Sequence, residues 1–318
     1  MPSEAKQSTP EQQPQIIGVS AQMQRLYGLI HKASANTYPV LITGEKGAGK
    51  TETARMIHSL CPRKGNTFVI SDCSNVAPTL AESELFGYEK GAFAGTAQAQ
   101  WGLFAFAREG TVLLKEVGNL PLHVQSKFAA MLQEREFRPI GSSHPLPFNA
   151  RILATSSRDL RADVECGNFR EDLFFRLSAL QITLAPLRER KQDIPLLVDY
   201  FVEKCEAGQS RAKFSAEGMR YLCDHDWPGN VSELQNVVRR AISMVSGQAI
   251  EVSDLKLCLE SPDHRRWTAG VSSYLDDRER QGITAALRES HGDKLAAARI
   301  LGIAESALQK RLEYYNLS

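Results

Sequence analysis

Short runs of apolar residues alternate with stretches of helical spacing along the first half of the chain. After residue 16, four apolar runs have the length and composition of buried strands: residues 40–43, 68–70, 112–114 and 152–155. Strands that alternate with helices pair in a parallel sheet with helices on both faces. The pattern therefore predicts an α/β domain.

The pattern changes beyond residue 186, where the strand signals end. Helical spacing recurs over residues 194–205, 216–225 and 231–245, which predicts a helical subdomain. Residues 261–273 break the periodicity and indicate a linker, and the polar, Pro- and Gln-rich residues 1–15 indicate a disordered tail. We therefore expect five segments: a tail of residues 1–15, an α/β subdomain of 16–185, a helical subdomain of 186–260, a linker of 261–275 and a C-terminal unit of 276–318.

The C-terminal unit has three helical segments, with Gly302 in the turn between the last two. Small alanines let such helices approach closely, so the pattern predicts an all-α helix-turn-helix. Four residues of the last segment recur at packing spacing and should face inward: Ala304, Leu308, Leu312 and Tyr315. The outward residues are our candidates for contact with double-stranded DNA: Glu305, Ser306, Gln309 and Lys310 for the major groove, and Arg311 for a phosphate or a base.

Charge limits how this unit can bind DNA. Residues 276–318 carry seven Lys/Arg and seven Asp/Glu, and the whole chain has 38 basic and 37 acidic residues, a net charge of +1. Attraction to phosphates is therefore weak, and a dimer that presents two recognition helices is needed. A three-helix oligomerisation module is the alternative interpretation.

Composition also narrows the class of protein. The six cysteines lie far apart without a CxxC pair, as in a reduced intracellular protein without a zinc site. No segment approaches the ~20 apolar residues that span a bilayer. The first residues do not resemble a signal peptide. We expect a cytoplasmic protein without a membrane partner.

The strongest chemical signal follows the first predicted strand and fills the pattern GxxxxGK[ST]. Glycines let the backbone wrap around phosphate oxygens, and amides at a helix N-terminus stabilise negative charge. The motif predicts binding of ATP or ADP, with Thr51 as a possible ligand of Mg²⁺. An ordinary glycine-rich turn is the alternative. The motif residues are Gly44, Glu45, Lys46, Gly47, Ala48, Gly49, Lys50 and Thr51.

Residues 84–96 read ELFGYEKGAFAGT and resemble the ESELFG...GAFTGA motif of sigma-54-dependent activators, a branch of the AAA+ ATPases. Residues 169–177, 186–195 and 227–236 are similar to later motifs of that family in order and spacing. The C-terminal unit resembles the Fis-type DNA-binding end common in it. The resemblance implies an AAA+ fold with a helical lid, in a member that lacks an N-terminal regulatory domain.

The resemblance also implies a mechanism. Members form rings that bind ATP between subunits, and hydrolysis drives the GAFTGA loop against sigma-54 RNA polymerase at the promoter. We therefore expect a homo-oligomer, from dimer to ring. In this chain the loop has Ala for the family's Thr and Thr for its last Ala, which leaves sigma-54 engagement open. The loop consists of Gly91, Ala92, Phe93, Ala94, Gly95 and Thr96.

Four positions depart from the family pattern. The Asp that helps to hold Mg²⁺ is Lys115 here, and the Asn that restrains the catalytic Glu is Asp72. The sensor Asn is Ser157, and an Arg expected after a Gly-Asn dipeptide is Ser232. Each change affects charge stabilisation during phosphoryl transfer, so hydrolysis should be slow or absent.

Other positions are retained. Glu116 matches the residue that polarises water, and Arg170 and Arg176 match the arginines that members supply across subunits. Lys115 beside Glu116 is a candidate nucleotide-binding residue, because a cation there can neutralise phosphate charge as Mg²⁺ would. Alternatively, Lys115 turns aside and Mg²⁺ stays bound to Thr51, phosphates and water.

Together these features predict a DNA-binding transcription regulator whose AAA+ domain binds nucleotide and hydrolyses ATP weakly or not at all. The alternative is an active ATPase that remodels sigma-54 RNA polymerase to open promoters.

Overall fold

The described part of the chain forms two compact units. The computed structural model describes residues 15–93, 96, 98–205, 213–244 and 249–260, and toward the C-terminus residues 283, 287, 290, 293–301, 308 and 312. The first unit comprises residues 1–164, 168–197 and 230–232, and the second comprises residues 165–167, 198–229 and 233–318.

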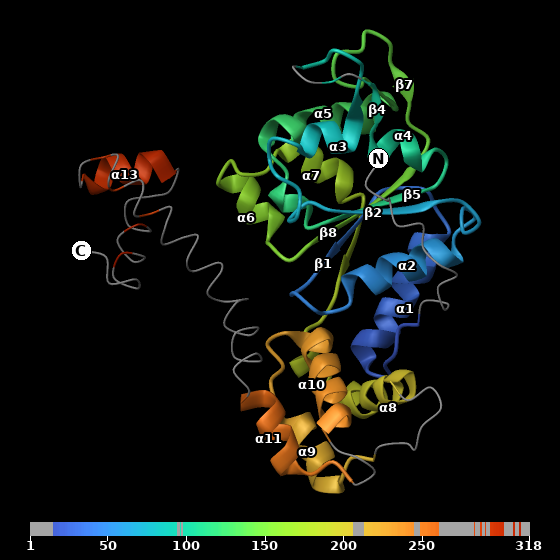
Figure 1. The fold of residues 1–318 in the computed structure, drawn as a ribbon, viewed down its shortest axis with the longest axis vertical. Helices are drawn as coiled ribbons and strands as arrows, with labels where there is room; N and C mark the ends of the chain where they lie inside the picture. The colour runs from blue at the N-terminus through green and yellow to red at the C-terminus, as the bar shows by residue number, and fades with distance from the viewer. Residues whose placement is uncertain are drawn as a thin grey trace. The chain divides into compact units, whose positions relative to one another are not determined.

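A five-stranded parallel sheet forms the centre of the first unit (Figure 1). Its strand order is β2-β5-β8-β1-β9. The side chains of β8 and most of those of β1 and β5 are buried, as expected where helices cover both faces. The predicted parallel sheet is confirmed, and it gains one strand, β9. The strands are β1 (Val40–Thr43), β2 (Phe68–Asp72), β5 (Thr111–Lys115), β8 (Arg151–Ser156) and β9 (Leu180–Thr183).

Helices cover both faces of this sheet (Figure 1). On one face α1 (Ala21–Ser34) and α2 (Lys50–Leu60) pack against β1, and Ser20 caps α1 by accepting a hydrogen bond from the amide of Met23. The opposite face carries α3 (Ala81–Phe86), α4 (Leu103–Ala107), α5 (Leu122–Glu134) and α7 (Glu171–Leu177). The remaining elements of this region are α6 (Leu160–Glu165), the hairpin strands β3 (Gly87–Tyr88), β4 (Gln100–Trp101), β6 (Glu136–Phe137) and β7 (Leu146–Pro147), and the 3₁₀ turns η1 (Val117–Asn119), η2 (Leu187–Glu189) and η3 (Lys191–Asp193).

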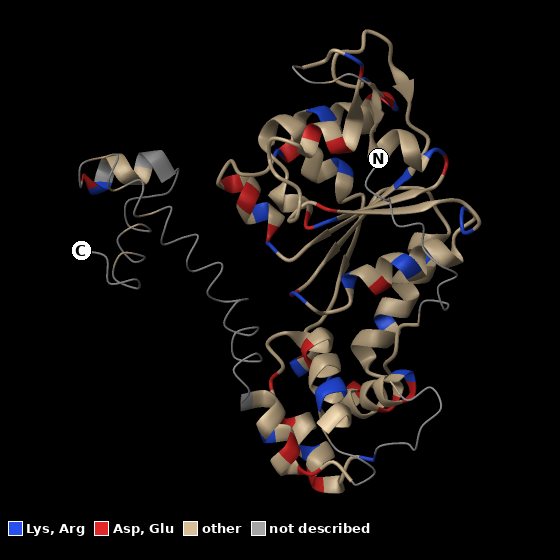
Figure 2. Ribbon diagram, in the orientation of Figure 1, with Lys and Arg blue, Asp and Glu red and all other residues tan. Residues whose placement is uncertain are grey.

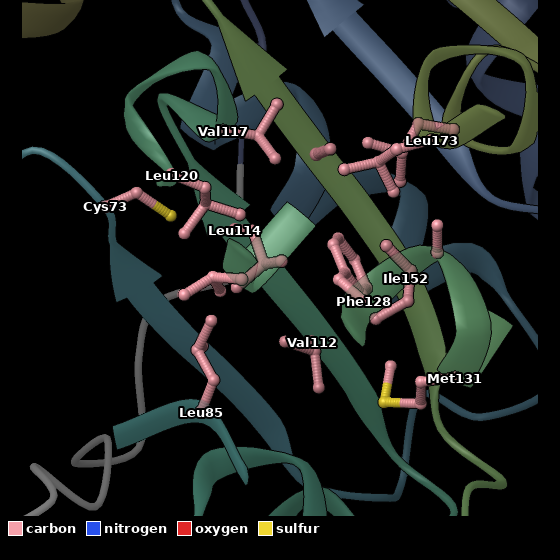
Figure 3. Close-up of a cluster of buried hydrophobic side chains, with 14 of the residues drawn as sticks. Cys73, Leu85, Val112, Leu114, Val117, Leu120, Phe128, Met131, Ile152 and Leu173 are labelled. Atoms are coloured by element: carbon pink, nitrogen blue, oxygen red, sulfur yellow. The ribbon is translucent and has the colours of Figure 1, made fainter. Parts of the chain in front are cut away.

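The larger hydrophobic cluster is rich in aromatic rings. Phe104 lies 5.1 Å from Phe86 and 5.5 Å from both Phe128 and Phe148, measured between ring centroids. Figure 3 shows Phe128 beside Ile152 and Val112, so the rings pack directly on the strands. This packing fixes β5 and β8, which end at the candidate site.

The helical segments beyond η3 are α8 (Ile194–Cys205), α9 (Ala216–Asp224), α10 (Asn230–Met244) and α11 (Val252–Glu260). The predicted helices over 194–205, 216–225 and 231–245 are confirmed, and α11 was not predicted. Within the second unit, the buried Trp227 donates from its indole N–H to the carbonyl of Leu222 at 2.8 Å. Arg240 donates to the carbonyl of Cys258 at 2.7 Å, which joins α10 to α11.

The C-terminal region contains α13 (Lys294–Leu301) and a small apolar cluster. Leu308 and Leu312 are buried in it with Ile283, Ala297 and Ala298, so the inward orientation predicted for the two leucines is confirmed. The other residues named for the last helix lie outside the described residues, together with Gly302: Ala304, Tyr315 and the DNA-contact candidates Glu305, Ser306, Gln309, Lys310 and Arg311.

Basic and acidic residues are interspersed along the described helices (Figure 2). This mixture agrees with the balanced composition of the chain. None of the helices in the described ranges is both long enough and apolar enough to cross a bilayer.

We predict that Phe104→Ala lowers the free energy of unfolding by about 3–5 kcal/mol, because it leaves a cavity between packed rings. Phe106→Ala on the same helix is the matched control, since that ring is 49% exposed and Phe104 is 2% exposed. Urea unfolding of both variants measures the difference. Equal, small losses would contradict the assignment of Phe104 to the centre of this core.

Candidate functional site

The glycine-rich loop joins the carboxyl end of β1 to the first residue of α2. Gly44, Gly47 and Gly49 have φ angles of 146°, 76° and 106°, a region that residues with a Cβ rarely adopt. A Cβ at Gly44 would also lie 3.0 Å from the carbonyl oxygen of Leu184. The loop therefore wraps its backbone tightly before α2, whose first amides remain available to an anion.

Lys50 is the first residue of α2, and its side chain is buried. Its ammonium donates to the carbonyls of Gly44 at 2.7 Å and Glu45 at 3.1 Å, and lies 3.4 Å from Oε1 of Glu116. Burial lowers the pKa of Lys50 and Glu116 opposes that shift, while the charges of Lys46 and Lys115 add to it. The loop therefore concentrates positive charge where the motif predicts phosphates. Thr51 follows in the same turn and is partly buried.

Glu116 directly follows β5 and adopts a left-handed conformation, with φ 52° and ψ 51°. Its Oε2 accepts two hydrogen bonds from Ser157, one from the amide at 2.8 Å and one from the hydroxyl at 2.6 Å. The Glu116 amide in turn donates to the hydroxyl of Thr155 at 3.2 Å. Because Oε1 faces Lys50, both oxygens of the carboxylate have a donor. Ser157, at the position where the resemblance implies a sensor Asn, therefore restrains this carboxylate.

Lys115 and Asp72 end the adjacent strands β5 and β2 and are directly paired in the parallel register. The ammonium of Lys115 donates to Oδ2 of Asp72 at 2.6 Å. Burial raises the pKa of Asp72, but donation from Lys115 and from the amide of Ser74 outweighs it, and the net pKa lies below the ordinary value of 3.8. The structure thus joins, in one ion pair, two positions at which the sequence departs from the motifs that it resembles.

Mg²⁺ takes oxygen ligands in a near-octahedral shell. Here position 115 presents an ammonium, the carboxylate of Asp72 is bonded to it, and the carboxylate of Glu116 is bonded to Ser157. Among the described residues, no group of three or more His, Cys, Asp or Glu side chains could hold a metal ion. The hydroxyl of Thr51 stays a predicted ligand, but the carboxylates of Asp72 and Glu116 do not fit a carboxylate-held Mg²⁺.

The glycine-rich loop is also fixed from a distant part of the chain. Both terminal nitrogens of Arg188 donate to the carboxylate of Glu45, at 2.6 and 2.9 Å, and the side-chain amide of Asn230 donates to it at 3.0 Å. The bond from Arg188 is the largest cause that lowers the pKa of Glu45. Asn230, fully buried with φ 57°, also donates to the carbonyl of Lys46 and accepts from the amide of Leu187 at 2.7 Å.

Further links were assigned no role from sequence. The amide of Ser232 donates to the carbonyl of Gly47 at 3.3 Å, so this position contacts the loop through its backbone without the family's cation. Arg190 donates to the carbonyl of Ala48 at 2.9 Å. Asp193 is fully buried and accepts hydrogen bonds from the amide and hydroxyl of Ser20, at 2.8 and 2.7 Å. These residues lay in motifs that resembled the family, and that was the only signal for them.

The two candidate arginines lie on and beside α7 and contact neighbours other than the glycine-rich loop. Arg170 donates through two nitrogens to the carboxylate of Asp172, at 3.0 and 2.9 Å, and is 43% exposed. Arg176 donates to the side-chain oxygen of Gln133 at 2.6 Å. The structure therefore does not bring these arginines to Glu116 within one chain.

The predicted sigma-contacting loop lies between β3 and β4. The amide of Gly91 donates to the carbonyl of Thr96 at 3.0 Å, and the Thr96 hydroxyl donates to the carbonyl of Phe93 at 2.7 Å. The Phe93 ring is 46% exposed and lies 5.0 Å from the ring of Tyr88. Ala92 precedes Phe93 in this turn. Two loop residues lie outside the described residues: Ala94 and Gly95.

Comparison with known families gives matches along most of the chain. Residues 16–183 match the sigma-54 interaction domain, residues 188–269 match the AAA+ ATPase lid domain, and residues 274–315 match the bacterial regulatory proteins of the Fis family. The first of these matches alone covers more than half of the 318 residues.

Full-length relatives agree with these matches. The chain is 40% identical to the nitrogen fixation protein AnfA of Azotobacter vinelandii over 95% of its own length and 58% of that protein. It is 37% identical to the transcriptional activator HyfR of Escherichia coli K12 over 95% of its length and 48% of that protein. It is 36% identical to the regulatory protein ZraR of Salmonella typhimurium over 93% of its length and 68% of that protein. The chain thus spans about half the length of the first two relatives.

Solved structures share the fold. NtrX from Brucella abortus in complex with ADP superposes with a TM-score of 0.71 at 28% identity, covering 95% of this chain and 69% of that one. The same protein in complex with ATP gives a TM-score of 0.72 at 27% identity, covering 95% and 70%.

We predict that the Asp72–Lys115 pair contributes about 1 kcal/mol to the free energy of unfolding at neutral pH, because both side chains are partly exposed. A carboxylate with a lowered pKa contributes stability above its ordinary value of 3.8, and that contribution is lost as the pH falls through the lowered pKa. Urea unfolding of D72N, K115Q and the double variant, from about pH 7 to about pH 3, measures the coupling energy. A coupling near zero at neutral pH, or one that does not decline in acid, would contradict the pairing.

Proposed function

The chain belongs to the family of sigma-54-dependent transcriptional activators, and from this membership we propose that it is a DNA-binding transcription regulator whose AAA+ domain binds ATP or ADP. We further propose that it hydrolyses ATP weakly or not at all. The observation that carries the second part is the Lys115–Asp72 ion pair at the position where hydrolysing members place a metal-binding carboxylate.

Nucleotide binding is supported by the glycine-rich loop. Its positive-φ glycines, the buried Lys50 and the N-terminus of α2 form a cradle for phosphate oxygens. The solved complexes of NtrX with ADP and ATP support the same assignment by similarity. Glu45 supports nucleotide binding indirectly. Its carboxylate accepts hydrogen bonds from Arg188 and Asn230, and these bonds fix the glycine-rich loop before a ligand binds.

Slow hydrolysis follows from charge at the end of β5. A metal-binding Asp would add negative charge and an oxygen ligand there, whereas Lys115 adds a positive charge that Asp72 already neutralises. A site of this kind can tolerate phosphate charge, but it does not align the γ-phosphate and an attacking water as a coordinated ion does. Nucleotide binding should therefore depend only weakly on Mg²⁺.

Glu116 is compatible with both proposals. Ser157 donates twice to its Oε2 and Lys50 lies 3.4 Å from its Oε1. Because the resemblance implies that hydrolysing members also restrain this carboxylate, through an Asn, the restraint by itself does not argue against turnover. The missing cation at Ser232 removes a further source of transition-state stabilisation.

An active ATPase that remodels sigma-54 RNA polymerase remains the alternative. Glu116 and Lys50 lie 3.4 Å apart in an arrangement that could support catalysis, and Arg170 and Arg176 are available to a neighbouring subunit. In this alternative Lys115 turns away and Thr51, phosphates and water hold Mg²⁺. A homo-oligomer, from dimer to ring, belongs to both proposals, because the arginines reach no nucleotide loop in their own chain.

DNA binding is assigned to the Fis-type unit, with the outward residues of its last helix reading the major groove. Leu308 and Leu312 are buried in the small core, as this proposal requires of the inward face of the last segment. Contact with sigma-54 RNA polymerase is assigned to the loop that contains Phe93, whose ring is half-exposed.

The hydrolysis proposal predicts a specific rescue. Unmodified protein should release phosphate more slowly than the usual rate of about 1 s⁻¹ or more. K115D alone should restore little, because it places a second carboxylate beside Asp72. D72N/K115D removes that repulsion and should make nucleotide binding more Mg²⁺-dependent and raise turnover, within the limits set by Ser157 and Ser232. Phosphate release and Mg²⁺ titration measure both effects.

The control for this experiment is K50A, which should abolish nucleotide binding and with it any turnover that originates at this site. Brisk, Mg²⁺-dependent turnover by the unmodified chain would show that Lys115 leaves Asp72 and that the active-ATPase alternative is correct.

The DNA-binding proposal predicts that deletion of residues 276–318 eliminates sequence-specific binding. Gln309→Ala should weaken specific binding by about 1–3 kcal/mol if that side chain reads a base, and should change non-specific binding less. Titration with operator and unrelated duplexes at one salt concentration measures both. Full specific affinity in the truncated protein would exclude this unit as the DNA-binding element.

A further inference from the structure

A second positively charged cavity lies at the edge of the sheet opposite the glycine-rich loop. It has a volume of about 240 Å³ and is lined by Arg63, Arg135 and Arg151 together with Thr37 and Asn149. Arg151 begins β8, whereas the glycine-rich loop follows the end of β1, which runs parallel to β8. The cavity is therefore separated from the nucleotide loop by the length of the strands, ~20 Å for six residues.

Arg151 is the buried charged residue of this cavity, with only 2% of its surface exposed, and the buried Phe148 and Ala150 line it as well. Its Nη2 donates to the carbonyl of Ala33 at 2.6 Å and its Nε donates to the carbonyl of Tyr38 at 3.4 Å. Its Nη1 is buried without a hydrogen-bond partner. Burial lowers the pKa of Arg151, the sulfur of Cys61 opposes that shift, and the charge of Arg63 adds to it. A buried cationic donor without a partner is costly unless something satisfies it.

The guanidinium of Arg63 donates to backbone carbonyls, whereas Arg135 is exposed and, among the described residues, only its backbone is held by hydrogen bonds. Arg63 donates to the carbonyl of Glu109 at 2.7 Å. Arg135 ends α5 in a left-handed conformation with φ 58°, and its carbonyl accepts from the amide of Phe148 at 2.8 Å. In the part of the chain that the structure describes, none of the three arginines forms an ion pair with a carboxylate. The cavity thus gathers three positive charges without a protein anion.

We propose that this cavity is a binding site for a small phosphate-class oxyanion, either free phosphate or the phosphate group of a small metabolite. Guanidinium groups match phosphate oxygens with paired N–H donors, and the polar residues Thr37 and Asn149 also line the cavity. The volume lies just below the range of ordinary small-molecule pockets, about 300–1,000 Å³, which favours a compact ligand.

An anion bound in this cavity would connect four segments of the chain that the hydrogen bonds of the sheet do not join at this edge. The lining residues come from the loop before β1, the turn after α2, the end of α5 and the start of β8. An anion there would offset repulsion between Arg63 and Arg151 and so stabilise the α/β domain independently of nucleotide. This inference does not depend on whether the chain hydrolyses ATP.

The test must separate this cavity from the glycine-rich loop, which also binds phosphate. Binding of inorganic phosphate is measured by calorimetry and by the shift in thermal unfolding for four proteins: the unmodified chain, K50A, and the double variants R63Q/R135Q and R25Q/R108Q, each made in the K50A background. Arg25 and Arg108 are exposed and do not line the cavity, so their double variant is a control for the loss of two charges. Arg151 stays unchanged, because its bonds to backbone carbonyls also support the fold.

K50A and R25Q/R108Q should keep a saturable phosphate site, whereas R63Q/R135Q in the K50A background should lose affinity at least about tenfold. If K50A alone abolishes all phosphate binding, the only site is the glycine-rich loop and the proposal is wrong. An equal loss in R25Q/R108Q would also overturn it, since the effect would then be net charge. A second arm measures the binding of glycerol phosphate and of succinate. Succinate that binds more tightly than both inorganic phosphate and glycerol phosphate would refute the assigned ligand class. If the phosphates bind more tightly, the one with the higher affinity shows whether the ligand is free phosphate or the phosphate group of a metabolite.

Discussion

The parallel register of the central strands is the constraint on which the candidate site depends. Because β2, β5, β8 and β1 run in the same direction, their carboxyl ends meet at one edge of the sheet. Asp72, Lys115, Glu116 and Ser157 occupy or follow these ends, and Lys50 enters from the loop after β1. Apolar packing on both faces of the sheet fixes the positions of the strands. The strand positions in turn fix the distances between the polar residues at the carboxyl edge.

Because the strand ends lie side by side, a charged residue at the end of one strand determines whether a carboxylate at the end of the next strand can bind a metal ion. The Cα atoms of Asp72 and Lys115 are partners in the ladder, so a carboxylate and an ammonium placed there form a bond at 2.6 Å. The same two positions with an amide and a carboxylate would leave the carboxylate free for a metal ion. In this chain the carboxylate of Asp72 therefore bonds to the protein's own ammonium, and Ser157 restrains Glu116.

The sequence predicted the fold and the loop better than it predicted the contacts. Apolar runs marked four of the five strands, but the short, alternating β9 (Leu180–Thr183) carried too weak a signal. The glycine-rich motif is local, so its position followed from spacing alone. The partner of Lys115 lies 43 residues away and that of Glu45 lies up to 185 residues away, and no periodicity encodes such pairs. The buried Asp193 lay in a motif that resembles the family, but its bonds to Ser20 were not predicted because they arise from tertiary burial.

The bond between Asn230 and Glu45 has a consequence for the order in which the protein folds. A ribosome releases the glycine-rich loop long before it adds residue 230, so the early chain lacks the amide that holds Glu45 and the carbonyl of Lys46. Closing a segment of this length costs conformational entropy that only late, long-range contacts repay. The loop therefore reaches its final shape at the end of folding of the first unit, and truncated nascent chains should expose it in a loose, protease-sensitive form.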